Sequence, residues 1–295
     1  KARELYELSA NLKNPYALNN LGNIYFYGDG VKKNYNMARE YYELSSHYHN
    51  SNALCNLGNF YYYGYGVDVN YEIAFAYYEE AAKMNDSNAL NQLGNIYFNG
   101  YGVTIDYNEA LKYYELAASN DNSNAYNNLG NLYKNGLGVE INYEKALTYY
   151  EVAASLNNHY AYNNLGNLYY NGYGVEIDYS LAKEYYELAA EQNNSSALNN
   201  LGIIYENGDG VDVDYNRARE YYELAAAQNN SNALNNLGIL YENGDGVEKD
   251  YKIAKEYYER AADLNNGDAY ENLGDLYYSG RGVKRNYEKA KKCYE

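Results

Sequence analysis

A fixed spacing of 36 residues organises this chain. A Leu-Gly pair recurs at that interval from Leu21-Gly22 to Leu273-Gly274, with no insertion or deletion between them. Of the 25 glycines, 24 stand at three positions in each of eight copies, and Gly267 is the one outside this pattern. Repeats of this regularity pack on their neighbours in one way and form a continuous solenoid. The period therefore predicts one repeat domain rather than separate globular domains.

Each copy reads as two helices joined by a glycine turn. In the first copy, helix A is expected over about 16–27, where Ala17 and Leu21 recur at helical spacing on one apolar face. Helix B is expected over about 35–46, with Tyr42 on its apolar face. The predicted fold class is all-α, a solenoid of about eight helix-turn-helix repeats. Full repeats are expected at 13–48, 49–84, 85–120, 121–156, 157–192, 193–228 and 229–264, with a truncated last repeat at 265–295 and the second helix of an incomplete upstream repeat at 1–12.

Glycine and asparagine mark the boundaries of these helices. Gly22 lies inside helix A, where glycine costs about 1 kcal/mol relative to alanine. Its presence in all eight copies predicts that the backbone of another helix approaches closely. The Gly-x-Gly turn that begins at Gly28 permits positive φ and ends helix A, and Val31 is expected to cover the core beneath it. Asn34 is the predicted N-cap of helix B, and Asn85 and its equivalents are expected to be left-handed.

The composition disfavours several classes of partner. The formal charge is −17 and the pI is near 4.6. A basic stripe that could neutralise phosphates is absent, so nucleic acid and an anionic membrane surface are disfavoured as partners, and we predict no nucleic-acid partner. No apolar run is long enough to span a membrane, so membrane insertion is not expected. The chain opens at Lys1 without Met and inside a helical pattern, so an upstream portion is expected.

Few residues point to catalysis or metal binding. Cys55 and Cys293 lie near opposite ends of a solenoid and have no zinc-site spacing. The three histidines form no pairing with a nucleophile. The acidic residues around Asp209 lack the ligand order of a calcium loop, and a solvated turn is the preferred interpretation, with weak calcium binding left open. The Gly-x-Gly loops follow no predicted strand, so they are turns rather than phosphate loops. We predict a non-enzymatic chain without cofactor or metal.

The order Ala-x3-Leu-Gly-x2-Tyr-x2-Gly-x-Gly-Val resembles the Sel1-like repeat over essentially the whole chain. The fourth copy carries it on Ala125, Leu129, Gly130, Tyr133, Gly136, Gly138, Val139, Ala146, Tyr150, Ala153 and Ala154. The resemblance implies a right-handed α/α superhelix, similar to tetratricopeptide repeats, whose helices A line a concave groove. It also implies work as a scaffold or adaptor rather than as a catalyst.

The chain departs from the family pattern in three ways. Tyrosine stands at Tyr41 and its equivalents, where the family often has tryptophan. Asparagine stands at Asn157 and its equivalents, where glycine is usual. The family has a cysteine-rich secreted branch with which β-lactam binding is associated, but the paired cysteines of that branch are absent here. That activity is therefore not expected.

Asparagine forms two columns on the helix-A face that would line the groove. The Asn20 series contains Asn20, Asn56, Gln92, Asn128, Asn164, Asn200, Asn236 and Asn272. The Asn23 series contains Asn23, Asn59, Asn95, Asn131 and Asn167, followed by Ile203, Ile239 and Asp275. An amide offers both a donor and an acceptor, so it can bind an extended peptide backbone or sugar hydroxyls. The alternative is biased coding, with the amides bonding one another and water.

A second variable region lies at the glycine turn. The middle residue of Gly-x-Gly is bulky at Tyr65, Tyr101 and Tyr173 but charged in the outer copies. Together with bulky residues near the end of helix A, these predict an aromatic ridge that could contact a partner. The alternative is that the rings pack onto neighbouring loops. The sequons at Asn85, Asn193, Asn194 and Asn229 are candidate N-glycosylation sites if the chain is secreted.

Three functional hypotheses follow. The first is a non-catalytic scaffold that binds a peptide or protein segment in an asparagine-lined concave groove. The second is a structural element whose copies stack end to end into a fibre, for example outside the cell. A hydrolase of the cysteine-rich branch has the least support.

Overall fold

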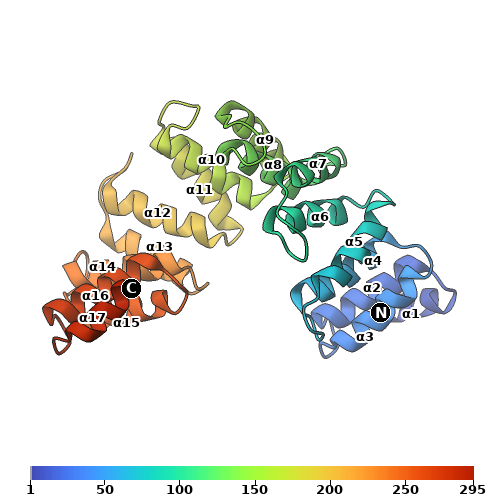
Figure 1. The fold of residues 1–295 in the computed structure, drawn as a ribbon, viewed down its shortest axis with the longest axis horizontal. Helices are drawn as coiled ribbons and strands as arrows, with labels where there is room; N and C mark the ends of the chain where they lie inside the picture. Colours follow the sequence, from blue (N-terminus) through green and yellow to red (C-terminus); the bar gives the residue numbers. More distant parts are fainter. Residues whose placement is uncertain (1) are drawn as a thin grey trace. The chain divides into compact units, whose positions relative to one another are not determined.

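The computed structural model describes residues 2–295, and all regular elements in that range are helices. They form two compact units, Lys1–Leu156 and Asn157–Glu295, each described here by itself (Figure 1). The first unit contains α1 (Ala2–Asn11), α2 (Pro15–Tyr27), α3 (Tyr35–Ser46), α4 (Ser51–Tyr63), α5 (Tyr71–Ala82), α6 (Ser87–Asn99), α7 (Tyr107–Ala118), α8 (Ser123–Asn135) and α9 (Tyr143–Ser155). The second contains α10 (His159–Asn171), α11 (Tyr179–Glu191), α12 (Ser195–Asn207), α13 (Tyr215–Ala226), α14 (Ser231–Asn243), α15 (Tyr251–Ala262), α16 (Gly267–Ser279) and α17 (Tyr287–Tyr294).

The predicted helix pair is confirmed in every copy, with α2 as the first helix A and α3 as its helix B. The two helices run antiparallel. The end of α3 lies beside the start of α2, where the Ser45 hydroxyl donates a hydrogen bond of 2.7 Å to the carbonyl of Pro15. Helix α1 packs on α2, as α3 packs on α4, and Lys1 lies outside the described residues. Within each unit, a helix A also packs on the helix B before it.

The core repeats with the sequence. In the first copy Ala17, Leu21, Ala38 and Tyr42 are buried, and the tyrosine equivalent to Tyr42 is buried in each of the next six copies. Burying one large apolar side chain is worth about 1.5–3 kcal/mol. Each repeat thus contributes the same apolar layer, and stability accumulates along the solenoid.

The helix-A glycine makes room for a tyrosine ring and not, as predicted, for a neighbouring backbone. A methyl group placed at Gly22 would lie 2.5 Å from the Tyr42 ring, and Gly58 has the same relation to Tyr78. The prediction was right that a side chain would clash but wrong about the atoms it would meet. Because glycine has no Cβ, the tyrosine ring of helix B can lie directly against the backbone of helix A.

Caps and turns follow the predicted chemistry. Gly28 ends α2 in the left-handed region at φ 84°, and its N–H donates to the carbonyl of Ile24. The Asn34 side chain accepts from the Met37 N–H at 3.1 Å and caps α3. Asn85 has φ 59°, which confirms the left-handed link between helix B and the next helix A. A second cap, before helix A, was not predicted: the Asn50 side chain accepts from the N–H of Ala53.

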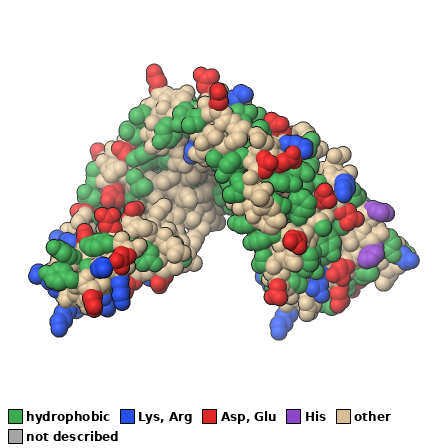
Figure 2. Space-filling model, in the orientation of Figure 1, with side chains coloured by type: hydrophobic (Ala, Val, Ile, Leu, Met, Phe, Trp, Pro, Cys, Tyr) green, Lys and Arg blue, Asp and Glu red, His purple; other side chains and the backbone are tan. Residues whose placement is uncertain are grey.

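Acidic side chains are spread over the surface in view, with lysines and arginines among them (Figure 2). No described helix combines the length and the apolar character needed to cross a bilayer.

Candidate functional site: an amide groove

The first unit has a groove of about 600 Å³ on its helix-A face. We call it the amide groove. It is lined by Asn19, Asn20, Asn23, Tyr27, Asn52, Cys55, Asn56, Asn59, Tyr63, Asn88, Asn91, Gln92 and Asn124. The predicted candidates Asn20, Asn23, Asn56, Asn59 and Gln92 therefore lie together on one surface. The surface is uncharged, since no lysine, arginine, aspartate or glutamate lines it.

Many of these amides are bonded to one another across repeats. The Asn56 Nδ2 donates 3.1 Å to the Oδ1 of Asn19, and the Asn128 Nδ2 donates 3.0 Å to the Oδ1 of Asn91. The second unit repeats this contact between Asn200 and Asn163, Asn236 and Asn199, and Asn272 and Asn235. The acceptors form a column one residue before the Asn20 series, which sequence reasoning missed. We call this set of bonds the amide ladder; within a unit, each of them ties a helix A to the next one.

In the first unit the ladder is interrupted at Cys55, and a second change in the sequence compensates for the lost bond. Cys55 occupies the acceptor position of the second repeat, and a buried thiol is a poor acceptor. The residue that would donate to it is Gln92, the one glutamine of the Asn20 series. Its longer side chain reaches other oxygens, at 3.4 Å from Asn59 Oδ1, Tyr63 Oη and Tyr78 Oη. Burial raises the pKa of the Cys55 thiol, so the thiol stays protonated at neutral pH.

The Asn23 series accepts hydrogen bonds from the buried tyrosines. The Tyr42 hydroxyl donates 2.7 Å to the Oδ1 of Asn23, and Tyr78 donates to Asn59 at the same distance. A buried hydroxyl without a partner costs about 1–3 kcal/mol. The same contact occurs between Tyr114 and Asn95, Tyr150 and Asn131, and Tyr186 and Asn167. The asparagine column is therefore partly structural.

The acceptor changes in the sixth and seventh repeats, where the column reads Ile203 and Ile239. There the Tyr222 hydroxyl donates 2.5 Å to Glu206, and Tyr258 donates 2.9 Å to Glu242. Each glutamate follows its isoleucine by three residues, which is one helical turn. The two substitutions coincide in the sequence, so this signal was available but was not recognised.

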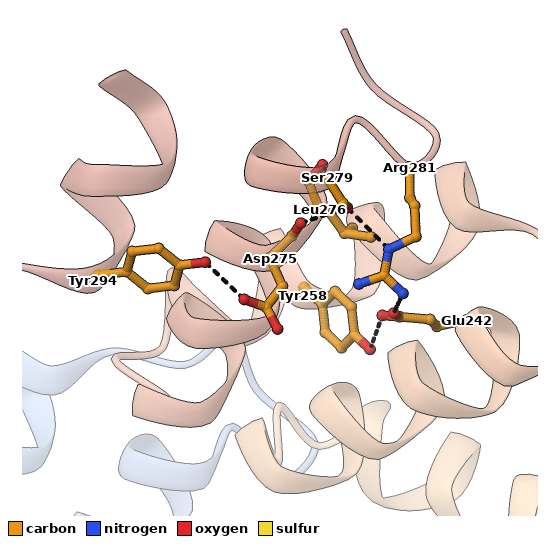
Figure 3. Close-up of polar contacts among 7 residues, drawn as sticks. All are labelled: Glu242, Tyr258, Asp275, Leu276, Ser279, Arg281 and Tyr294. Atoms are coloured by element: carbon orange, nitrogen blue, oxygen red, sulfur yellow. Dashed lines mark hydrogen bonds and ion pairs between the residues drawn. The ribbon is translucent and has the colours of Figure 1, made fainter. Parts of the chain in front are cut away.

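The two glutamates have different neighbours. Arg281 forms an ion pair with Glu242 at 2.7 Å, so the Glu242 carboxylate contacts both a guanidinium and the Tyr258 hydroxyl (Figure 3). In the preceding repeat Asp245 stands at the position of Arg281. Burial raises the pKa of the Glu206 carboxyl and the charge of Asp245 adds to the rise, whereas the hydrogen bond from Tyr222 lowers it.

In the last repeat Asp275 takes the place of the asparagine and accepts from the Tyr294 hydroxyl at 2.7 Å, as Figure 3 shows.

Among the acidic turn residues, Asp214 caps α13 and Asp209 accepts from the Tyr170 hydroxyl at 2.6 Å. Burial, together with that bond, raises the pKa of Tyr170 to about 12. Within residues 2–295 no three His, Cys, Asp or Glu side chains gather as a metal site would need.

Two groove amides keep their hydrogen-bonding groups available for a partner. Within the described chain no hydrogen bond occupies the side chain of Asn20 or Asn52, although both line the groove. Asn23 accepts from Tyr42 through its oxygen, which leaves its Nδ2 as a donor. The remaining predicted candidates, Asn164, Asn167, Asn200 and Asn236, lie on helices A of the second unit.

Two of the candidate ridge tyrosines stack on a neighbouring ring. The Tyr65 ring stacks on Tyr35 with centroids 5.6 Å apart, and Tyr101 stacks on Tyr71 at 4.7 Å. Tyr173 is 40% exposed.

The candidate sequons also differ. Asn85, Asn193 and Asn229 occupy left-handed turns. Asn194 is buried and caps α12, accepting from the N–H groups of Ser196 and Ala197. Its side chain is therefore occupied in the folded protein.

The repeats of this chain match a known protein family. The Sel1 repeat family matches at residues 1–14, 15–47, 51–86, 87–122, 123–158, 159–194, 195–230, 231–266 and 267–295. No curated protein matches the chain.

Solved structures give the same result. A Sel1 repeat protein from Oxalobacter formigenes is 32% identical with a TM-score of 0.69, and the match covers 82% of this chain and 95% of that one. A protective antigen with an SLR fold from uropathogenic Escherichia coli is 28% identical with a TM-score of 0.64, over 98% and 70% of the two chains. An immunity protein from Pseudomonas aeruginosa is 26% identical with a TM-score of 0.50, over 65% and 74%. With nine matched segments and this repeat geometry, the chain belongs to the Sel1 repeat family.

Proposed function

We propose that this chain is a non-catalytic scaffold that holds an extended segment of a partner protein along the amide groove. Sel1 repeat proteins generally mediate protein–protein interaction. The observation that carries the proposal is the pair Asn20 and Asn52, whose amides line the groove without an internal hydrogen bond. A side-chain amide presents a donor and an acceptor together, which matches the N–H and C=O of an extended backbone.

The neutral lining supports a backbone ligand over a charged one. The chain carries a formal charge of −17, yet none of that charge lines the groove. Amide contacts to a backbone do not depend on the partner's charge, so binding through them should vary little with salt. The ladder bonds hold other lining amides, such as Asn19 and Asn56, in place before a partner arrives, which reduces the entropy lost on binding.

The test is binding of peptide arrays or candidate proteins to the full chain and to the Asn20→Ala, Asn52→Ala double variant. Loss of two hydrogen bonds is expected to weaken binding by about tenfold. Asn108→Ala, at an exposed position outside the groove lining, is the matched control and should bind as the parent does. Undiminished binding by the double variant would refute the groove assignment.

Asn128→Ala with Asn131→Ala is a less suitable test, because Asn128 donates to Asn91 and Asn131 accepts from Tyr150. Those changes would alter stability as well as binding. End-to-end stacking into a fibre stays a prediction. Light scattering over a concentration series tests it, and a strictly monomeric species at high concentration would count against it.

A further inference from the structure

A smaller cavity of about 150 Å³ opens between the first and second repeats. We call it the ring notch. It is lined by Phe26, Tyr27, Tyr42, Asn56, Asn59, Phe60, Tyr63 and Tyr65. Tyr27, Asn56, Asn59 and Tyr63 also line the amide groove, so the notch and the groove are continuous. A chain lying on the groove amides would pass the mouth of the notch.

The walls of the notch are mainly aromatic. Phe26 lies edge-on to Tyr65 with ring centroids 5.0 Å apart, and it contacts Phe60 at 5.7 Å. Tyr65 is held in turn against Tyr35 and Tyr63. Aromatic rings favour edge-to-face and offset neighbours at centroid distances of about 4.5–7 Å. One further ring in this space could meet several of the wall rings in such geometries.

Several polar atoms that line the notch are bonded within the protein. The Tyr42 hydroxyl donates to Asn23, the Asn56 Nδ2 donates to Asn19, and the Asn59 Oδ1 accepts from Tyr78. An apolar occupant would therefore break none of these bonds. The two tyrosines shared with the groove, Tyr27 and Tyr63, are 63% and 51% exposed, so their ring edges reach the solvent at the mouth.

The size of the notch fits one ring, since an apolar cavity of about 150 Å³ holds a benzene molecule. We propose that the ring notch binds one aromatic side chain of the protein segment that the amide groove holds. The inference rests on the proposed function: the groove would bind the backbone of any sequence, and the notch would select an aromatic residue at one position.

The second unit provides an internal comparison. A cavity of similar size, about 150 Å³, lies between the fifth and sixth repeats and is lined by Asn167, Tyr170, Asn171, Tyr186, Asn200 and Ile203. The Tyr170 hydroxyl is held there by Asp209, which occupies the position of Tyr65. An aspartate at this position is thus compatible with the fold. Tyr65→Asp would remove one aromatic wall of the first notch and put there the residue type that the sixth repeat carries at this position.

The experiment selects a displayed library of random peptides on the full chain and measures the affinity of an enriched peptide and its aromatic-to-Ala version. We expect one shared aromatic position, whose replacement weakens binding by about tenfold or more. Tyr65→Asp should weaken binding of the peptide that carries the aromatic residue by a similar factor. It should leave the affinity for the alanine version of the peptide unchanged. Asp209→Ala in the second unit is the control and should alter neither affinity.

The two proposals fail in different ways. If Asn20→Ala with Asn52→Ala weakens binding but Tyr65→Asp does not, the notch assignment is wrong and the groove stands. If the groove variants have no effect, or no peptide is enriched, the proposed function fails and this inference fails with it. Phe26→Lys, which introduces the residue found at the equivalent position Lys134, replaces Tyr65→Asp if that variant does not fold.

Discussion

Two groups of repeats bury the same tyrosine but satisfy its hydroxyl differently. In the first unit the acceptor is a neutral amide, as in the contact of Tyr78 with Asn59. In the sixth and seventh repeats it is a carboxylate one turn further along, as in the contact of Tyr222 with Glu206. The buried hydroxyl therefore requires an acceptor but does not specify which residue provides it. A repeat can change its groove face provided that a neighbouring position takes over the hydrogen bond.

This exchange alters the surface a partner would meet. Where asparagine is the acceptor, the groove position carries an amide, and where glutamate takes over, it carries Ile203 or Ile239. The amide repeats suit a peptide backbone, whereas the isoleucine repeats offer an aliphatic surface beside a carboxylate. The difference also has an electrostatic consequence, because a partly buried carboxylate is less favourable than an amide unless a cation accompanies it.

The largest expected effect concerns the contact between the helix-A glycine and the buried tyrosine ring, which both groups of repeats share. Gly58→Ala and Gly202→Ala should each lower the free energy of unfolding by about 1–3 kcal/mol through overpacking. The new methyl group would overlap the rings of Tyr78 and Tyr222, and this outweighs the gain in helix propensity of about 1 kcal/mol. Urea denaturation checks both variants.

Gly267→Ala is the matched control, because nothing lies within 4 Å of a methyl group placed there. It should be neutral or slightly stabilising. A large difference between Gly58→Ala and Gly202→Ala would show that the two units do not share one packing.

Removing the hydroxyl acceptor should affect the two regions unequally. Asn59→Ala is expected to cost about 1–3 kcal/mol, because the Tyr78 hydroxyl is left without its acceptor. Glu206→Ala is expected to cost about 1 kcal/mol, since it also removes a carboxylate whose burial is unfavourable. Thermal and urea denaturation measure both.

Adding Ile203→Asn to Glu206→Ala should recover about 0.5–1.5 kcal/mol by restoring the amide acceptor found in the neighbouring repeat at Asn167. Absence of any rescue would contradict the interchange of acceptors.

Asp245→Arg should stabilise the second unit by about 0.5 kcal/mol. The arginine would stand opposite Glu206 as Arg281 stands opposite Glu242, and it would remove a like charge. The gain in melting temperature should shrink as salt is added, because salt screens exposed ion pairs. Asp245→Ala separates the two contributions: it removes the repulsion without adding the ion pair.

The smallest effect is a pH dependence confined to the glutamate region. The pKa of Glu206 is raised in the folded protein above its ordinary value of 4.5. The native state therefore binds its proton more tightly than the unfolded state, and this site's contribution to stability falls as pH rises from near 4.5 through the raised pKa. Glu206→Gln should remove this slope. Denaturation midpoints of both proteins across the acidic range test it, and parallel profiles would refute it.

Much of the fold could be predicted from the sequence because the information is local and repeated. The bounds of α3, the cap at Asn34 and the left-handed turn at Asn85 follow from propensities that act within a few residues. The presence of a clash at Gly22 could also be predicted. Its cause could not, because Tyr42 lies 20 residues later and the sequence does not show which side chain covers the glycine.

The candidate site was predicted only in part. Periodicity places Asn20 and Asn56 on one face, and the structure adds that Asn56 bonds to Asn19 of the preceding repeat whereas Asn20 has no internal bond. The exchange of Asn23-type for Glu206-type acceptors was visible as two coincident substitutions, but its meaning required the position of the Tyr222 hydroxyl.

By itself, the sequence determined the repeat, its length, its two helices and its apolar positions, because each depends on spacing along the chain. Only the tertiary structure decided which asparagines hold the repeats together and which, such as Asn20, have no hydrogen bond within the chain. A hydrogen bond of about 3 Å depends on the relative placement of two helices, and the spacing of residues within one helix does not contain that distance.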